Sequence, residues 1–310
     1  MRLTTTLILI VAAAVLALMW FFLGDTDEVP AEPLFDGVEA GAVRRLAIRR
    51  DDLEIVLTRD GDRWRMTGPV EAAGNPERIE KILEAFLPLT AEAGGIAGAS
   101  PERYGLDSPR VRLTIETTGG TTRSIAIGQS VPLSEAVAAR RGEGPLFVIP
   151  EEAARLVDAP PIKWVERRLV RMEPEAARRI GVRAEGAEGG YYELIRREGR
   201  WMLDTGRHEW RASAEATGEL LDELTGAEAV DIVVDPPPSA VLGFDDPRVT
   251  VEVTGEAGER TQLILGKNAP DREAGLYARR GDLDTIWIVQ PDVLLKLNRP
   301  ATLYRDRRLI

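Results

Sequence analysis

The sequence predicts an α+β fold that is present twice in tandem. The stretch Tyr104–Val111 (YGLDSPRV) returns as Leu242–Val249 (LGFDDPRV), and in each copy an apolar run then ends at a glycine, Gly128 or Gly266. Short apolar stretches of period two, separated by turn residues, indicate antiparallel strands joined by short hairpins. We therefore expect two repeats of a mainly antiparallel sheet, each with one amphipathic helix and a short closing helix, after one N-terminal transmembrane helix.

The first expected element is a membrane anchor. Leu3–Leu23 is uncharged and mainly apolar, and at about 1.5 Å per residue a helix of this length spans roughly 30 Å, the thickness of a bilayer's hydrocarbon core. Arg2 precedes it and acidic residues follow it, which predicts that the N-terminus is inside and that the bulk of the chain is periplasmic or extracytoplasmic. The alternatives are a cleaved signal peptide and a buried soluble helix.

The domain boundaries follow from the repeat. Residues 1–24 are the expected signal anchor, and residues 25–37 an acidic, Pro-containing stalk. Further matches, such as Ala139–Glu143 with Ala278–Asp282, extend the two copies to residues 38–170 and 171–310. Length alone is consistent with two domains of about 150 residues.

Each copy begins with two strands and a hairpin. In the first copy these are Val43–Ile48 and Leu53–Thr58, and in the second they are 177–182 and Tyr191–Arg196. Asp-Gly or Glu-Gly supplies the next turn, and a tryptophan follows it, Trp64 or Trp201. We interpret both tryptophans as core anchors of their hairpins.

A helix follows in both copies. Asn75 is a suitable N-cap and Pro76 suits the first helical position, whereas Ser213 is the cap in the second copy. Four more strands per copy follow the Gly-hydrophobe-Asp turn. In the first copy they are 111–116, the strand ending at Gly128, 136–140 and 146–149. In the second copy they are 249–253, the strand ending at Gly266, 276–279 and 286–289. A short helix then closes each unit, Glu151–Val157 or Asp292–Leu297.

Composition excludes several classes of function. The formal charge of −11 argues against nucleic-acid binding. The chain has no cysteine, which excludes disulfides, thiolate metal sites and Cys nucleophiles. His208 is the only histidine and has no counterpart in the first copy. Since no nucleotide-binding, metalloprotease or hydrolase motif is present either, we predict no catalytic residue, no metal ligand and no cofactor.

The repeated signature is interpreted as structural. Gly tolerates positive φ, the Asp side chain accepts backbone hydrogen bonds, and Pro stiffens the entry to the next strand. The signature residues are Tyr104, Gly105, Asp107, Pro109 and Gly128 in the first copy and Gly243, Asp245, Pro247 and Gly266 in the second. A ligand role for Asp107 or Asp245 is the alternative, although one or two carboxylates fall short of a Ca²⁺ site.

Recurrent arginine pairs are the best candidates for a partner surface. Arg140-Arg141 in the first copy corresponds to Arg279-Arg280 in the second. Solvated strand faces or ion pairs within each repeat are the simpler explanation, and an anionic partner surface is the alternative.

The signature and its surroundings resemble the bacterial family known as domain of unknown function 4340. The resemblance rests on Tyr104-Gly105-Leu106-Asp107-x-Pro109, the upstream tryptophan and the Gly-ended strand, and it covers most of the chain after the membrane segment. The second copy departs from it with Leu242 and Phe244 in place of the tyrosine and leucine. Members are typically membrane-anchored, and many are encoded beside ABC-type transport systems resembling those of gliding motility.

The sequence therefore predicts a non-enzymatic binding or scaffolding protein in the cytoplasmic (inner) membrane, accessory to an ABC-type transport system. Its partners would be the membrane, through Leu3–Leu23, and a membrane protein. The region from Trp164 to Glu175, between the repeats, is where we expect a groove. The alternatives are an extracytoplasmic polysaccharide hydrolase with an acidic pair and a structural envelope spacer.

Overall fold

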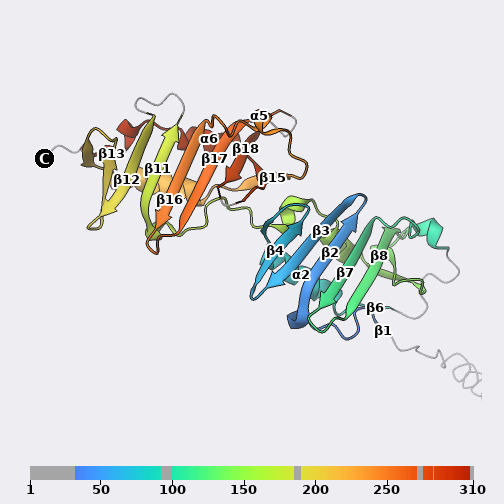
Figure 1. The fold of residues 1–310 in the computed structure, drawn as a ribbon. Helices are drawn as coiled ribbons and strands as arrows, with labels where there is room; N and C mark the ends of the chain where they lie inside the picture. Colours follow the sequence, from blue (N-terminus) through green and yellow to red (C-terminus); the bar gives the residue numbers. More distant parts are fainter. Residues whose placement is uncertain (1–31, 92–99, 185–189, 271–274, 282, 308–310) are drawn as a thin grey trace, which may run out of the picture.

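Two antiparallel sheets make up most of the structure, a computed structural model that describes residues 32–91, 100–184, 190–270, 275–281 and 283–307 (Figure 1). The first sheet has eight strands in the order β10-β9-β8-β7-β2-β3-β4-β5. Their bounds are β2 (Val43–Arg50), β3 (Leu53–Asp60), β4 (Arg63–Gly68), β5 (Ala72–Ala73), β7 (Val111–Thr117), β8 (Thr122–Ser130), β9 (Ala136–Arg140) and β10 (Leu146–Pro150).

The second sheet repeats this order and adds one strand. It runs β14-β13-β12-β11-β16-β17-β18-β19-β15. Its strands are β11 (Ala177–Ala184), β12 (Tyr191–Arg197), β13 (Arg200–Asp204), β14 (Glu209–Arg211), β15 (Ala229–Val233), β16 (Val249–Gly255), β17 (Arg260–Ala269), β18 (Gly275–Arg280) and β19 (Ile286–Val289). Every named pairing is antiparallel. The predicted α+β class and the predominance of antiparallel strands are confirmed.

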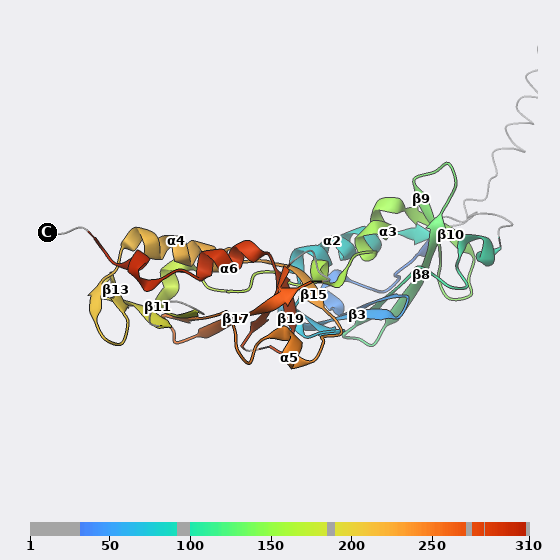
Figure 2. The same ribbon diagram turned by 90° about the horizontal axis from the view of Figure 1, so that it is seen from above.

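The helices cover one face of each sheet. In the first repeat these are α2 (Pro76–Phe86) and α3 (Glu151–Val157), and in the second α4 (Ala214–Thr225) and α6 (Pro291–Leu297). Figure 2 shows all four on the same side of the molecule, with both sheets below them. Each of the two longer helices buries one apolar stripe, Ile79, Ile82, Leu83 and Phe86 in α2 and Thr217, Leu220, Leu221 and Leu224 in α4.

Side-chain caps fix the starts of the two longer helices. The Asn75 side chain accepts a hydrogen bond from the Arg78 N–H at 3.2 Å, and the Ser213 hydroxyl accepts one from the Ala216 N–H at 3.2 Å. Each cap satisfies one of the backbone donors that a helix start leaves unpaired. The sequence also predicted α3 correctly, whereas α6 begins at Pro291, one residue earlier than expected.

Several short elements were not expected from the sequence. They are the edge strands β5, β14 and β15, the four-residue helix α5 (Ser239–Leu242), and the pair formed by β1 (Glu32–Pro33) and β6 (Thr90–Ala91). Their brevity explains the omission, because two to five residues hold too little periodicity to separate a strand from a loop.

The segment that connects the two repeats forms backbone hydrogen bonds with the second repeat. The Leu169 N–H donates to the Ala227 carbonyl at 3.0 Å, and the Ala229 N–H donates to the Arg167 carbonyl at 2.9 Å. The Leu34 N–H makes the equivalent bond to the Leu89 carbonyl at 2.8 Å in the first repeat. Each repeat thus takes up the segment that precedes it, and one hydrophobic cluster contains residues of both repeats.

The predicted anchor Leu3–Leu23 and most of the predicted stalk lie outside the described residues. Among the residues that are described, no helix has the length and apolar character needed to cross a membrane.

Candidate functional site

The signature glycines occupy the positions that the turn requires. Gly105 has φ of 66° and Gly243 has φ of 78°, both in the left-handed region that favours glycine. Asp107 and Asp245 are exposed on these turns. Within the described residues, no group of three or more His, Cys, Asp or Glu side chains could hold a metal ion.

The later glycine of each signature allows a close backbone contact. A Cβ atom on Gly128 would lie 2.1 Å from the Tyr104 carbonyl oxygen, and a Cβ on Gly266 would lie 2.1 Å from the Leu242 carbonyl oxygen. The signature segment therefore packs on the sheet face opposite the helices, where Leu106 is buried with Ala126. This segment covers one end of that face and leaves the rest open.

The two hairpin tryptophans differ in burial. Trp64 is 7% exposed, whereas Trp201 is half-buried against the main cluster. Arg59 lies over the Trp64 ring, with its guanidinium carbon 5.9 Å from the ring centroid.

The four recurrent arginines do not form one surface. The Arg140 side chain is 15% exposed and pairs with Glu143 at 3.7 Å, and Arg141 donates to the Pro33 carbonyl at 3.2 Å. Arg279 stacks on Phe244 at 5.0 Å. Arg280 is 7% exposed and lies between the repeats.

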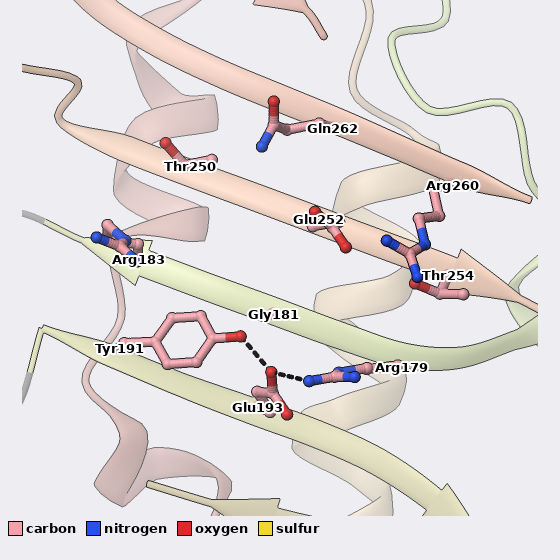
Figure 3. A pocket seen from close by; sticks show the side chains of 10 residues that line it. All are labelled: Arg179, Gly181, Arg183, Tyr191, Glu193, Thr250, Glu252, Thr254, Arg260 and Gln262. Atoms are coloured by element: carbon pink, nitrogen blue, oxygen red, sulfur yellow. Dashed lines mark hydrogen bonds and ion pairs between the residues drawn. The ribbon is translucent and has the colours of Figure 1, made fainter. Parts of the chain in front are cut away.

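The open face of the second sheet holds a polar hollow, which we call the sheet-face groove (Figure 3). Its volume is about 470 Å³. Alternate residues of β11, β12, β16 and β17 point into it, because successive side chains of a strand lie on opposite faces. The lining residues are Arg179, Gly181, Arg183, Tyr191, Glu193, Thr250, Glu252, Thr254, Arg260 and Gln262.

A buried carboxylate organises one side of the groove. Glu193 is 8% exposed and accepts hydrogen bonds from the Arg179 guanidinium and the Tyr191 hydroxyl (Figure 3). The hydrogen bond to Glu193 raises the pKa of Arg179, and burial raises the pKa of Tyr191. Both groups therefore remain protonated donors to Glu193 at neutral pH.

The other charged groups of the groove have no ion-pair partner among the described residues. Arg183 lies over the Tyr191 ring at 5.6 Å and has no carboxylate partner in the part of the chain that the structure describes. Among the described residues, Arg260 and Glu252 have neither an ion pair nor a hydrogen bond through their side chains. The groove thus offers two cations, one anion and nearby hydroxyl and amide groups to a ligand.

On the equivalent face of the first sheet, a cross-strand ion pair stands at the position that corresponds to Arg179 and Thr254. The strand registers align Arg45 with Arg179 and Glu116 with Thr254. Arg45 pairs with Glu116 at 2.6 Å and approaches Glu54 at 4.0 Å. Thr254 stands at the position of Glu116, so in the second repeat the corresponding arginine, Arg179, pairs with Glu193 on the other neighbouring strand instead.

The sheet-face groove was not among the sites predicted from the sequence. The available signal was the period-two placement of Arg179 and Arg183, which puts both on one face of the first strand of the repeat. Glu193 gave no signal, because its burial depends on Tyr191 and on the neighbouring strand.

A hollow also lies where the sequence predicted a groove between the repeats. Its volume is about 680 Å³, and Glu166 and Arg171 line it together with Trp64 of the first repeat and Arg280 of the second. We call it the junction groove.

The comparisons with known proteins give one family. The family model described as Domain of unknown function (DUF4340) matches residues 64–240 and again residues 204–310. No curated protein and no solved structure matches the chain.

Proposed function

We propose, from the premise that this chain belongs to the family of domain of unknown function 4340, that it is a membrane-anchored, extracytoplasmic binding or scaffolding protein. Its partner in this proposal is a component of an ABC-type transport system in the same membrane.

The observation that carries a binding role is the set of unpaired charges in the sheet-face groove. Arg183, Arg260 and Glu252 have no partner of opposite charge among the described residues. Charges that lack an internal partner keep their hydration in the free protein and can pair with a complementary surface on association. In the first repeat Glu116 stands at the position of Thr254 and pairs with Arg45, whereas no carboxylate of the described residues pairs with Arg260 of the second repeat, which is the proposed binding unit.

The mixed signs favour a protein surface as the ligand. A nucleic acid would require clustered cations without interleaved carboxylates, whereas a folded protein offers both signs in fixed positions. The anchor is supported by the apolar Leu3–Leu23 segment and the preceding Arg2.

The test is capture of a transport component from membranes. Tagged full-length protein is crosslinked in cells, extracted in mild detergent, and the captured membrane-transport proteins are quantified. We expect the double variant R183E/R260E to reduce this capture at least tenfold. The control is R103E, which reverses an exposed arginine on the first repeat.

Two outcomes would contradict the proposal. One is that no membrane-transport component is captured under any growth condition. The other is that R183E/R260E captures as much as the unmodified protein, which would favour a structural spacer.

A further inference from the structure

The junction groove has a counterpart at the far end of the second repeat, which we call the end groove. The Glu166 N–H donates to the Ala73 carbonyl at 2.9 Å, and the Asp306 N–H donates to the Arg211 carbonyl at 2.9 Å. Each groove lies between the tryptophan hairpin, the start of the longer helix and the segment that ends the repeat. The end groove has a volume of about 810 Å³. The residues that line it are Gly199, Arg200, Trp201, Arg211, Ala212, Ser213, Ala214, Glu215, Leu303, Arg305, Asp306 and Arg307.

The junction groove is partly filled by the next repeat. Arg280 and Leu283 of the second repeat line it. Nearby, the Thr285 hydroxyl donates to the Glu71 carbonyl across the junction. No element of the described chain plays this part at the end groove, where Leu303 is 48% exposed.

An ion pair across the junction shows what kind of group the end segment binds. Arg167, in the segment that ends the first repeat, pairs with Glu228 of the second repeat at 2.7 Å. The repeat aligns Arg167 with Arg307, which is exposed and has no partner among the described residues. At the junction, the equivalent arginine Arg167 thus has a carboxylate partner, Glu228. Arg307 has no such partner among the described residues.

The end groove is also more basic than the junction groove. The junction groove has four arginines (Arg63, Arg65, Arg171, Arg280) and three carboxylates (Asp60, Asp62, Glu166). The end groove has four arginines (Arg200, Arg211, Arg305, Arg307) and two carboxylates (Glu215, Asp306). Arg211 pairs with one of these carboxylates, Asp306, at 3.4 Å.

We propose that the end groove binds an acidic, extended peptide segment of a partner protein. The carboxylates of this segment would pair with Arg200, Arg305 and Arg307, the three exposed arginines of the groove that have no carboxylate partner in the described structure. The Trp201 and Leu303 side chains would contact its apolar residues. This site is separate from the sheet-face groove and does not depend on it.

A second copy of this chain fits less well. The position of Glu228 corresponds to Thr90 in the first repeat, and the strand around Thr90 already pairs with Glu32–Pro33. In a second copy, Arg141 of its first repeat would take the position that Arg280 has at the junction. It would therefore place a cation in the basic end groove. A second copy would therefore supply neither the carboxylate nor a free strand.

The test uses a labelled peptide with the sequence of residues 227–233, Ala-Glu-Ala-Val-Asp-Ile-Val, which contains the acid that pairs with Arg167. Fluorescence anisotropy at low salt measures its binding to the full-length protein in detergent. We expect the double variant R200E/R305E to bind it at least tenfold more weakly. The same peptide with Gln and Asn in place of Glu and Asp should also bind at least tenfold more weakly.

The control variants separate this site from the other proposal. R103E and R183E/R260E should bind the peptide as the unmodified protein does, and circular dichroism should show that every variant is folded. Equal binding of the acidic and the neutral peptide would overturn the proposal, as would equal binding by R200E/R305E or no binding by the unmodified protein. Self-association that is lost in R200E/R305E would also overturn it, because the occupant would then be a second copy.

Discussion

Replacing Gly128 by alanine should destabilise the first repeat through one backbone contact. The added methyl group would lie 2.1 Å from the Tyr104 carbonyl oxygen, and real Cβ contacts are almost never shorter than 3.0 Å. The carbonyl belongs to the backbone and the Leu106 side chain lies only 3.1 Å away, so neither a rotamer change nor a small shift relieves the clash. The signature segment must move by roughly 1 Å or detach from β8.

The expected cost is at the upper end of what overpacking causes, about 3 kcal/mol. For a unit of this size, this loss corresponds to a decrease in Tm of roughly 10 °C. Urea unfolding monitored by circular dichroism measures the loss, and hydrogen exchange identifies which repeat opens. The exchange of β8 and β9 amides should increase, while the second repeat remains protected.

Two further variants make this prediction specific. G266A has the same geometry against the Leu242 carbonyl and should transfer the effect to the second repeat. G41A is the control, because a Cβ there meets nothing within 4 Å and Gly41 does not have positive φ. If G128A changes the free energy of unfolding by less than about 0.5 kcal/mol, as a surface substitution does, the contact does not explain the signature.

Two other substitutions test the core and the junction. Tyr192 is 2% exposed, its hydroxyl forms no hydrogen bond within the described structure, and burial raises its pKa above the usual 10.0. The stability that depends on the protonated hydroxyl is therefore fully present below about pH 10 and is lost as the pH rises through the folded-state pKa. Phenylalanine has no hydroxyl to ionise. In urea titrations at alkaline pH, Y192F should therefore have a larger free energy of unfolding than the parent protein. Leu169 is 1% exposed at the junction, and L169A should cost about 3 kcal/mol and separate the calorimetric transitions of the two repeats. The matched variant L34A, at the equivalent position, should weaken only the first repeat, and a single unchanged transition in L169A would contradict the coupling.

The sequence was sufficient where a local signal determines the structure. The Asn75-Pro76 pair and Ser213 placed the starts of the two longer helices, because capping and the fixed φ of proline act within one turn. Gly105 and Gly243 identified the left-handed turn for the same reason. Because the sequence is repeated, most of the remaining strands could be predicted at corresponding positions of both copies.

The sequence was insufficient where a property depends on residues far apart in the chain. The burial of Glu193, and the absence of a partner for Arg260 among the described residues, depend on which strands are neighbours. The difference between the junction and end grooves appears only when Arg167 is compared with Arg307 across the whole repeat. The three edge strands are short, and tertiary packing rather than propensity determines them.

The junction between the repeats is heterologous, because the β5 side of one unit meets the β15 side of the next rather than its own kind. A contact of this type has no twofold axis and does not close on two members. Applying the rotation and translation that relate the first unit to the second once more would place a third unit against the β14 side of the second. That side corresponds to the β5 side of the first unit. The hairpin registers align Asp60 and Asp62 of the junction groove with Arg197 and Gly199. Engineering such an array would require restoring acids at these two positions. The duplicated molecule is therefore a polar arrangement, because its two units present different sides at its two ends.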